Sequence, residues 1–158
     1  MPRRAPTIGV VIAIAIAGSL IAPNDAVAAC WRPPVDAPVV DPFREPACTW
    51  CAGNRGLEFE TTSATTVRAA AAGRIEFAGP VAGIAYVVVR LPNGWRHTYG
   101  RLSTISVRAG APVLAGHAVG RTDRRLFFGW RIGDRYVDPA PQLGALVVRP
   151  RLVPLDGS

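Results

Sequence analysis

From about residue 53 to residue 143, the sequence consists of short runs of alternating apolar and polar residues, separated by turns that contain glycine. The clearest run is Ile84 to Arg90, and the Asn93-Gly94 pair that soon follows is a favoured tip for a tight hairpin. Strict alternation is the period of a strand with one buried face, whereas no segment sustains the 3.6-residue period of an amphipathic helix. The pattern therefore predicts an all-β domain.

The N-terminal segment predicts export. Two arginines precede an uncharged apolar run from Ala5 to Ala22, and Pro23 and the small-residue stretch 26–29 follow it. A charged start, an apolar centre and an Ala-x-Ala end are the features of a secretory signal peptide, which we expect to span residues 1–29. A permanent anchor is the alternative, because the run is close to the roughly 20 residues that cross a bilayer. The proline and the small residues favour cleavage, and hence a secreted or envelope-associated protein outside the cytoplasmic membrane.

Export permits disulfides, and the chain has three cysteines: Cys30, Cys48 and Cys51. The spacing of the last two is that of thioredoxin-like motifs, but no βαβ pattern surrounds it, and a zinc knuckle would need a fourth ligand nearby. We therefore expect a structural disulfide, either between Cys48 and Cys51 or between one of them and Cys30. The residues before Cys30 also resemble a lipobox, so a lipidated Cys30 is the less favoured alternative to ordinary cleavage.

The segments suggest one domain with a lead-in and a tail. Residues 30–52 form a proline-rich lead-in that contains the Cys48/Cys51 pair, 53–145 the β-sheet core, and 146–158 a loosely ordered tail. About half of the 158 residues are apolar, which is enough for one compact core. The net charge is +7, and every basic side chain that it counts is an arginine. Because these arginines are spread through alternating strands, they predict a solvated surface and no nucleic-acid partner.

Several motifs along the core occur in a recognisable order. Residues 54–58 (Asn-Arg-Gly-Leu-Glu) lie where one family has His-x-Gly-x-Asp, and residues 99–102 (Tyr-Gly-Arg-Leu) where it has Tyr-x-His-Leu. Paired glycine turns and a closing hairpin, 126–128 with 136–139, follow at similar spacings. This order resembles the lysostaphin-type (LytM) peptidases, which cut the peptide cross-links of peptidoglycan. The resemblance implies two antiparallel sheets in a β-sandwich or half-barrel, with little helix outside the signal segment.

Lipoyl and biotinyl carrier domains share the glycine turns of this fold. They attach their cofactor to a lysine, and the chain contains none. The carrier function is therefore excluded on chemical grounds.

The resemblance also indicates which residues replace the family's zinc site. Zinc is held there by the His and Asp of the first motif and by the second His of a His-x-His pair, while two further histidines assist catalysis. Carried over to this sequence, those five positions are Asn54, Glu58, Phe127, Arg125 and Arg101. Only Glu58 remains an anionic ligand, because Phe offers no lone pair and guanidinium groups repel a metal. We expect no catalytic residue, no bound metal and no cofactor, although the family would use zinc.

Other titratable residues do not restore an enzyme site. His97 and His117 lie away from the family's histidine positions, and we expect them to be packed or surface imidazoles. Glu58 and Glu60 share a strand face, as a pair of glycosidase carboxylates could, but nothing marks either as an acid with a raised pKa. A solvated strand edge explains that pair better.

Two arginines at former histidine positions suggest a different kind of groove. Arg101 and Arg125 would bind carboxylates, with Phe127, Tyr99 and Trp130 as aromatic neighbours that contact the ligand. The resemblance then implies a degenerate, activator-like domain that binds peptidoglycan or regulates a wall hydrolase. A membrane would be reached only through the signal segment or a lipidated Cys30.

Two alternatives stay open from the sequence. Arg101 and Arg125 would pair with Glu58 and Asp123 if they merely filled the former site. The alternative function is a zinc-dependent peptidoglycan endopeptidase that retains activity with non-standard ligands.

Overall fold

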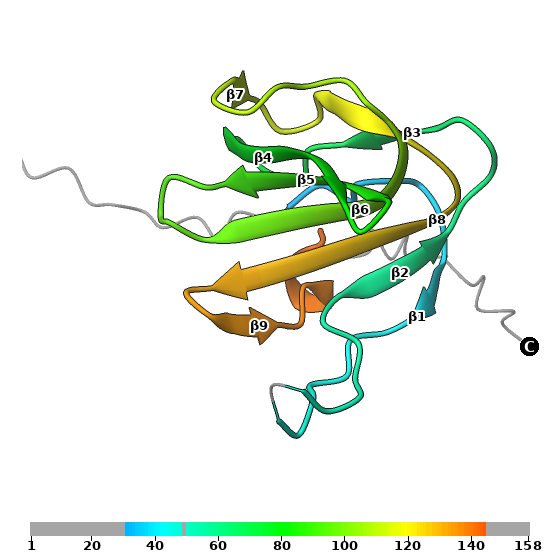
Figure 1. Cartoon of the computed structure of the whole chain (residues 1–158), viewed down its shortest axis with the longest axis vertical. Coiled ribbons are helices and arrows are strands. Elements are labelled where there is room, and N and C mark those ends of the chain that lie inside the picture. The colour runs from blue at the N-terminus through cyan, green and yellow to red at the C-terminus, as the bar shows by residue number, and fades with distance from the viewer. Residues whose placement is uncertain (1–30, 49, 145–158) are drawn as a thin grey trace, which may run out of the picture.

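A computed structural model describes residues 31–48 and 50–144 of the chain (Figure 1). The predicted signal peptide, Cys30 and the predicted tail lie outside the described residues. Within them the all-β prediction is confirmed, because the ordered elements are nine strands and one 3-10 turn. No helix in this part of the chain is long and apolar enough to cross a membrane. The strands are β1 (Val39–Asp41), β2 (Leu57–Glu60), β3 (Thr65–Arg68), β4 (Gly73–Val81), β5 (Ile84–Arg90), β6 (Arg96–Ile105), β7 (Pro112–Val113), β8 (Ala118–Ile132) and β9 (Arg135–Val137), and the turn η1 spans Ala140–Gln142.

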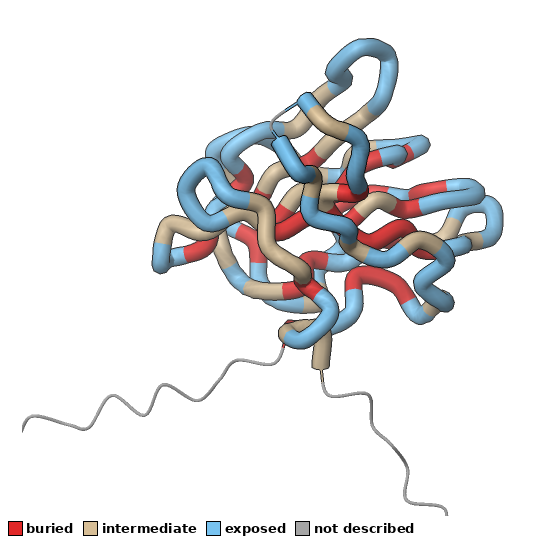
Figure 2. Tube along the Cα trace, turned by 90° about the horizontal axis from the view of Figure 1, so that it is seen from below, coloured by how far each residue is buried: buried red, intermediate tan, exposed pale blue. Residues whose placement is uncertain are grey.

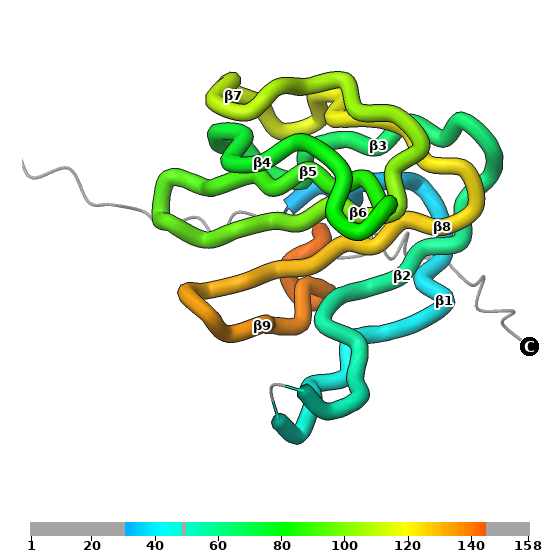
Figure 3. The backbone as a smooth tube through the Cα atoms, in the orientation of Figure 1, coloured from blue at the N-terminus to red at the C-terminus, as the bar shows by residue number. Residues whose placement is uncertain are grey.

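All nine strands belong to one antiparallel sheet, which corrects the expectation of two sheets. The order is β1-β2-β8-β6-β5-β4-β7, with β3 and β9 also paired to β8. The reason is the length of β8, which has 15 residues. One edge of β8 pairs with β6, and its other edge pairs with β3, β2 and β9 in turn, so β8 joins all of these strands into one sheet. Figure 3 shows β8 crossing the molecule between β6 and β2.

The core lies on the face of the sheet that carries a row of large apolar side chains. Leu57 on β2 pairs with Phe128 on β8, which pairs with Tyr99 on β6, and Tyr99 pairs with Val87 on β5. All four are buried. Directly opposed residues share a face of a sheet, so this row forms a continuous apolar layer. Figure 2 shows the buried stretches inside the molecule and the exposed turns around them.

The lead-in contributes to this core. Trp31 is buried, and its ring centroid lies 4.1 Å from that of His97 and 4.7 Å from that of Trp130. The imidazole of His97 is therefore packed among aromatic rings, whereas His117 is exposed in a turn. These are the two ordinary environments that the sequence predicts for the histidines.

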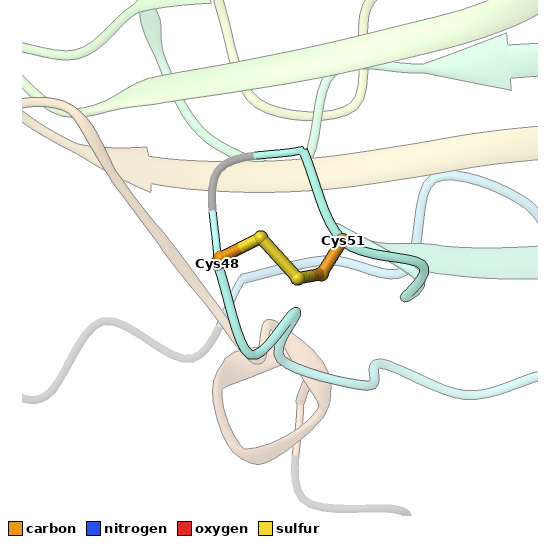
Figure 4. Close-up of a disulfide and its surroundings, with 2 residues drawn as sticks. All are labelled: Cys48 and Cys51. Atoms are coloured by element: carbon orange, nitrogen blue, oxygen red, sulfur yellow. A yellow bond between two sulfur atoms is a disulfide. The ribbon is translucent and has the colours of Figure 1, made fainter.

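The lead-in also carries the disulfide. Of the pairings that the sequence left open, the structure forms the one between Cys48 and Cys51, with Cα atoms 4.9 Å apart (Figure 4). Trp50 lies inside this small loop and is 93% exposed. No thioredoxin-like βαβ unit surrounds the pair in the described residues, so the bridge fixes a turn ahead of β2.

Candidate functional site

A second cross-strand row lies on the face of the sheet opposite the core row. Glu58 pairs with Phe127, Phe127 with Gly100, and Gly100 with Tyr86. Each residue is the chain neighbour of a core residue, and adjacent strand residues point to opposite faces. A Cβ at Gly100 would lie 2.5 Å from the Tyr86 ring and 3.3 Å from the Phe127 ring. The absence of a side chain at residue 100 therefore lets the two aromatic rings converge.

The β6–β8 ladder is interrupted beside this row. Gly100 pairs with Phe127, but the next paired residues are Leu102 and Thr122. Arg101 on β6 and residues 123–126 on β8 therefore stand outside that ladder. Arg101 has a φ of 62°, a left-handed conformation that is uncommon for a residue with a side chain. Such bulges redirect a side chain, and here the guanidinium of Arg101 reaches the carboxylate on β2.

Glu58 is held by two arginines. Arg101 donates from Nη2 to Glu58 Oε1, and Arg125 donates from Nη1 to Glu58 Oε2, both at 3.0 Å. The Glu58 side chain is only 12% exposed, while the two arginine side chains are 48% and 54% exposed. A buried carboxylate is costly unless it is paired, and here each oxygen has its own cation. The pairing of Arg101 and Arg125 with Glu58, which the sequence left open, is therefore present. Asp123, the second carboxylate considered there, instead accepts a hydrogen bond from the Ala64 N–H at 3.1 Å.

Thr122 links the backbones of both arginines. Its hydroxyl oxygen lies 2.9 Å from the Arg101 carbonyl oxygen and 2.6 Å from that of Arg125, and the side chain is fully buried. The two arginines come from different strands at the point where the ladder is interrupted. Thr122 therefore fixes the spacing between their backbones where regular pairing does not.

Asn54, which the sequence resemblance aligns with the family's first histidine, has a structural role. Its Nδ2 donates to the carbonyl oxygens of Asp41 (3.2 Å) and Pro42 (3.1 Å), and its Oδ1 accepts from the Gly56 N–H at 3.3 Å. These bonds tie the turn before β2 to the strand at the edge of the sheet. The buried amide therefore uses its polar atoms in hydrogen bonds to the backbone and is not placed beside Glu58 as a metal ligand.

The structure corrects two of the predicted aromatic contacts. Tyr99 is completely buried, its hydroxyl accepts the Ala70 N–H at 2.7 Å, and burial raises its pKa above the usual value. Trp130 is buried against Trp31 and does not reach the arginines. Both side chains belong to the core face because of the register of their strands. Tyr86, which the sequence did not single out, lies on the arginine side instead, and only its pairing with Gly100 reveals this.

A cleft of about 630 Å³ opens where the ladder is interrupted. We call it the arginine cleft. It carries charged and polar groups from β6 and β8 and apolar groups from the β4–β5 turn, β5 and β6. Its lining residues are Gly83, Ile84, Ala85, Arg101, Leu102, Ser103, Asp123, Arg124 and Arg125.

The residues that the sequence resemblance assigns to the family's zinc positions do not fit zinc. Among the described residues, no group of three or more His, Cys, Asp or Glu side chains is placed to hold a metal ion. Both carboxylate oxygens of Glu58 already accept from guanidiniums, and the ring of Phe127 provides no lone pair. Imidazole and carboxylate ligands of the usual catalytic zinc site are not assembled here. The donor set and the two adjacent cations favour an anion.

The fold is that of a lysostaphin-type domain. The model of Peptidase family M23 matches residues 52–139, which is more than half of the chain. The chain therefore belongs to peptidase family M23. No curated protein matches the sequence significantly.

Solved structures support the same fold. The catalytic domain of the antimicrobial peptidase lysostaphin from Staphylococcus simulans is 22% identical, with a TM-score of 0.58 over 66% of this chain and 90% of that chain. A chain of the SpoIIQ–SpoIIIAH pore forming complex is 19% identical, with a TM-score of 0.63 over 72% and 90%. Helicobacter pylori Csd3 is 21% identical, with a TM-score of 0.63 over 73% of this chain, which spans only 37% of the Csd3 chain. At these identities the likeness shows the fold.

Proposed function

We propose that the protein is an exported, non-catalytic M23 domain that binds peptidoglycan, alone or while it regulates a wall hydrolase. The observation that carries the proposal is the occupation of both Glu58 oxygens by Arg101 and Arg125. These three residues stand at former zinc or catalytic positions of the family. Positions that belong to the family's zinc site therefore carry two guanidinium groups in this chain.

The energetics support an anion-binding role. To coordinate a metal, Glu58 would first have to lose both guanidinium partners while it stays largely buried. The metal would then sit beside two positive side chains, and their repulsion would weaken its binding. A wall anion would instead be attracted to the exposed half of each guanidinium.

Membership of family M23 favours one other function, a zinc-dependent peptidoglycan endopeptidase with non-standard ligands. That enzyme would need Glu58 and other side chains to rearrange around zinc. The two functions differ in metal content, turnover and the effect of chelators. They can be separated with one preparation of protein.

The test uses protein purified after export, without added metal. Metal content is measured by mass spectrometry, cleavage of purified muropeptides by chromatography, and binding by co-sedimentation with peptidoglycan sacculi. We expect less than stoichiometric zinc, no cleavage with or without added zinc, and sedimentation that a chelator does not reduce. Stoichiometric zinc with turnover, or no sedimentation with sacculi, would overturn the proposal.

A further inference from the structure

We propose that the arginine cleft binds the free C-terminal carboxylate of a peptide whose last residue is small and apolar. This inference rests on the proposed function and adds the chemical group that is recognised. It follows from three features of the cleft: guanidinium N–H groups that remain available as donors, the fixed spacing of the two arginines, and an apolar lining next to them.

The first feature is the supply of donors. A guanidinium has five N–H groups, and Arg101 and Arg125 each give one hydrogen bond to Glu58 and make no other side-chain hydrogen bond within the described part of the chain. Both are about half exposed and line the cleft. The Glu58 carboxylate shows that one carboxylate can span the two guanidiniums. The carboxylate of a ligand can accept hydrogen bonds from the N–H groups that do not contact Glu58.

The second feature is the fixed spacing of the arginines. The left-handed conformation of Arg101 sets where its side chain leaves β6, and the buried Thr122 hydroxyl contacts the carbonyl oxygens of Arg101 and Arg125. A ligand that meets groups already in position loses less free energy to their ordering. Thr122 is thus a positioning residue for the cleft and does not touch the ligand.

The third feature is the apolar part of the cleft lining. Ile84 and Ala85 on β5 and Leu102 on β6 give an apolar lining, and Ile84 is 40% exposed. An exposed aliphatic side chain beside an anion site can pack against the side chain of the residue that bears the carboxylate. The combination selects the end of a peptide over a fully polar anion.

The direct test is an NMR titration of isotope-labelled protein purified after export. The probes are N-acetyl-alanyl-alanine, the same dipeptide with a C-terminal amide, and inorganic phosphate. We expect the free acid to shift the amide signals of Arg101, Ser103 and Arg125 with a Kd of ~1–10 mM. The amide and phosphate should each bind about tenfold more weakly. Equal binding of the acid and the amide, or tighter binding of phosphate, would overturn the inference.

Variants test which residues carry the binding. R101K/R125K keeps both charges next to Glu58 but loses the two-pronged donor, and should weaken free-acid binding about fivefold. T122V should weaken it as well, while T122S, which keeps the hydroxyl, should restore it. The matched control is R90K/R108K, which changes two exposed arginines that lie outside the cleft and have no side-chain partner among the described residues, and it should bind like wild type. Wild-type binding in T122V would refute the positioning role.

Sacculus sedimentation of the same proteins separates the two proposals. If the wild type and R101K/R125K both sediment with sacculi, and to the same extent, the cleft does not recognise the wall, and the inference fails while the proposed function stands. If the wild type binds the dipeptide acid but not sacculi, the proposed function fails.

Discussion

Acidification should destabilise this fold through His97. The imidazole is completely buried on β6, and neither of its nitrogens has a hydrogen-bond partner among the described residues. The rings around it, Trp31 at 4.1 Å and Phe128 at 5.2 Å between centroids, offer no charge to stabilise a proton. Burial disfavours the charged imidazolium and lowers the pKa of His97 from 6.5 to about 3.

The sign and size of the effect follow from this pKa. Between about pH 6.5 and about pH 3 the unfolded chain binds a proton at His97 and the folded chain does not, so the free energy of unfolding falls as the pH falls. The loss approaches about 1.4 kcal/mol per pH unit, which gives about 2 kcal/mol at pH 5. For a domain of this size, that corresponds to a fall in Tm of roughly 10 °C.

The matched variant is H97F, which keeps an aromatic ring but cannot bind a proton. Urea unfolding at several pH values, followed by circular dichroism, gives the stability of both proteins. The wild type should lose about 2 kcal/mol more than H97F between about pH 7.5 and pH 5, because all other titrating groups are shared. Parallel losses in the two proteins would refute the reasoning.

Three further substitutions test the fold. Y99F removes the buried hydroxyl that accepts a backbone N–H at 2.7 Å, and should cost about 1–2 kcal/mol in urea unfolding; an unchanged midpoint would contradict that bond. G120A places a Cβ 2.3 Å from the Thr104 carbonyl oxygen, so we expect a loss of about 2 kcal/mol or more in thermal unfolding. C48S/C51S opens a short loop and should cost about 2 kcal/mol under oxidising conditions; a difference that persists after reduction of the wild type would show that the bridge is not its cause.

The sequence by itself determined the all-β class, and it also predicts the loss of the family's zinc ligands. Alternation with period two and glycines at turn spacing are local properties, because they depend only on which residues neighbour each other along the chain. The interpretation of Asn54 and Phe127 is local as well, since an amide oxygen is a poor zinc ligand and a phenyl ring has no lone pair, whatever the fold. The sequence also restricted the cysteine pairings, of which the structure forms the one between Cys48 and Cys51.

Only the tertiary structure decided the sheet count, the face of each aromatic residue and the partners of the arginines. A single sheet results because β8 is long enough to pair along both edges, and strand pairing is not encoded in any one segment. Tyr99 faces the core and Tyr86 the arginine side because of the register between strands, which a one-residue shift would reverse. Glu58 meets Arg101 and Arg125 across separations of 43 and 67 residues, and contacts at such distances along the chain exist only once the sheet has formed.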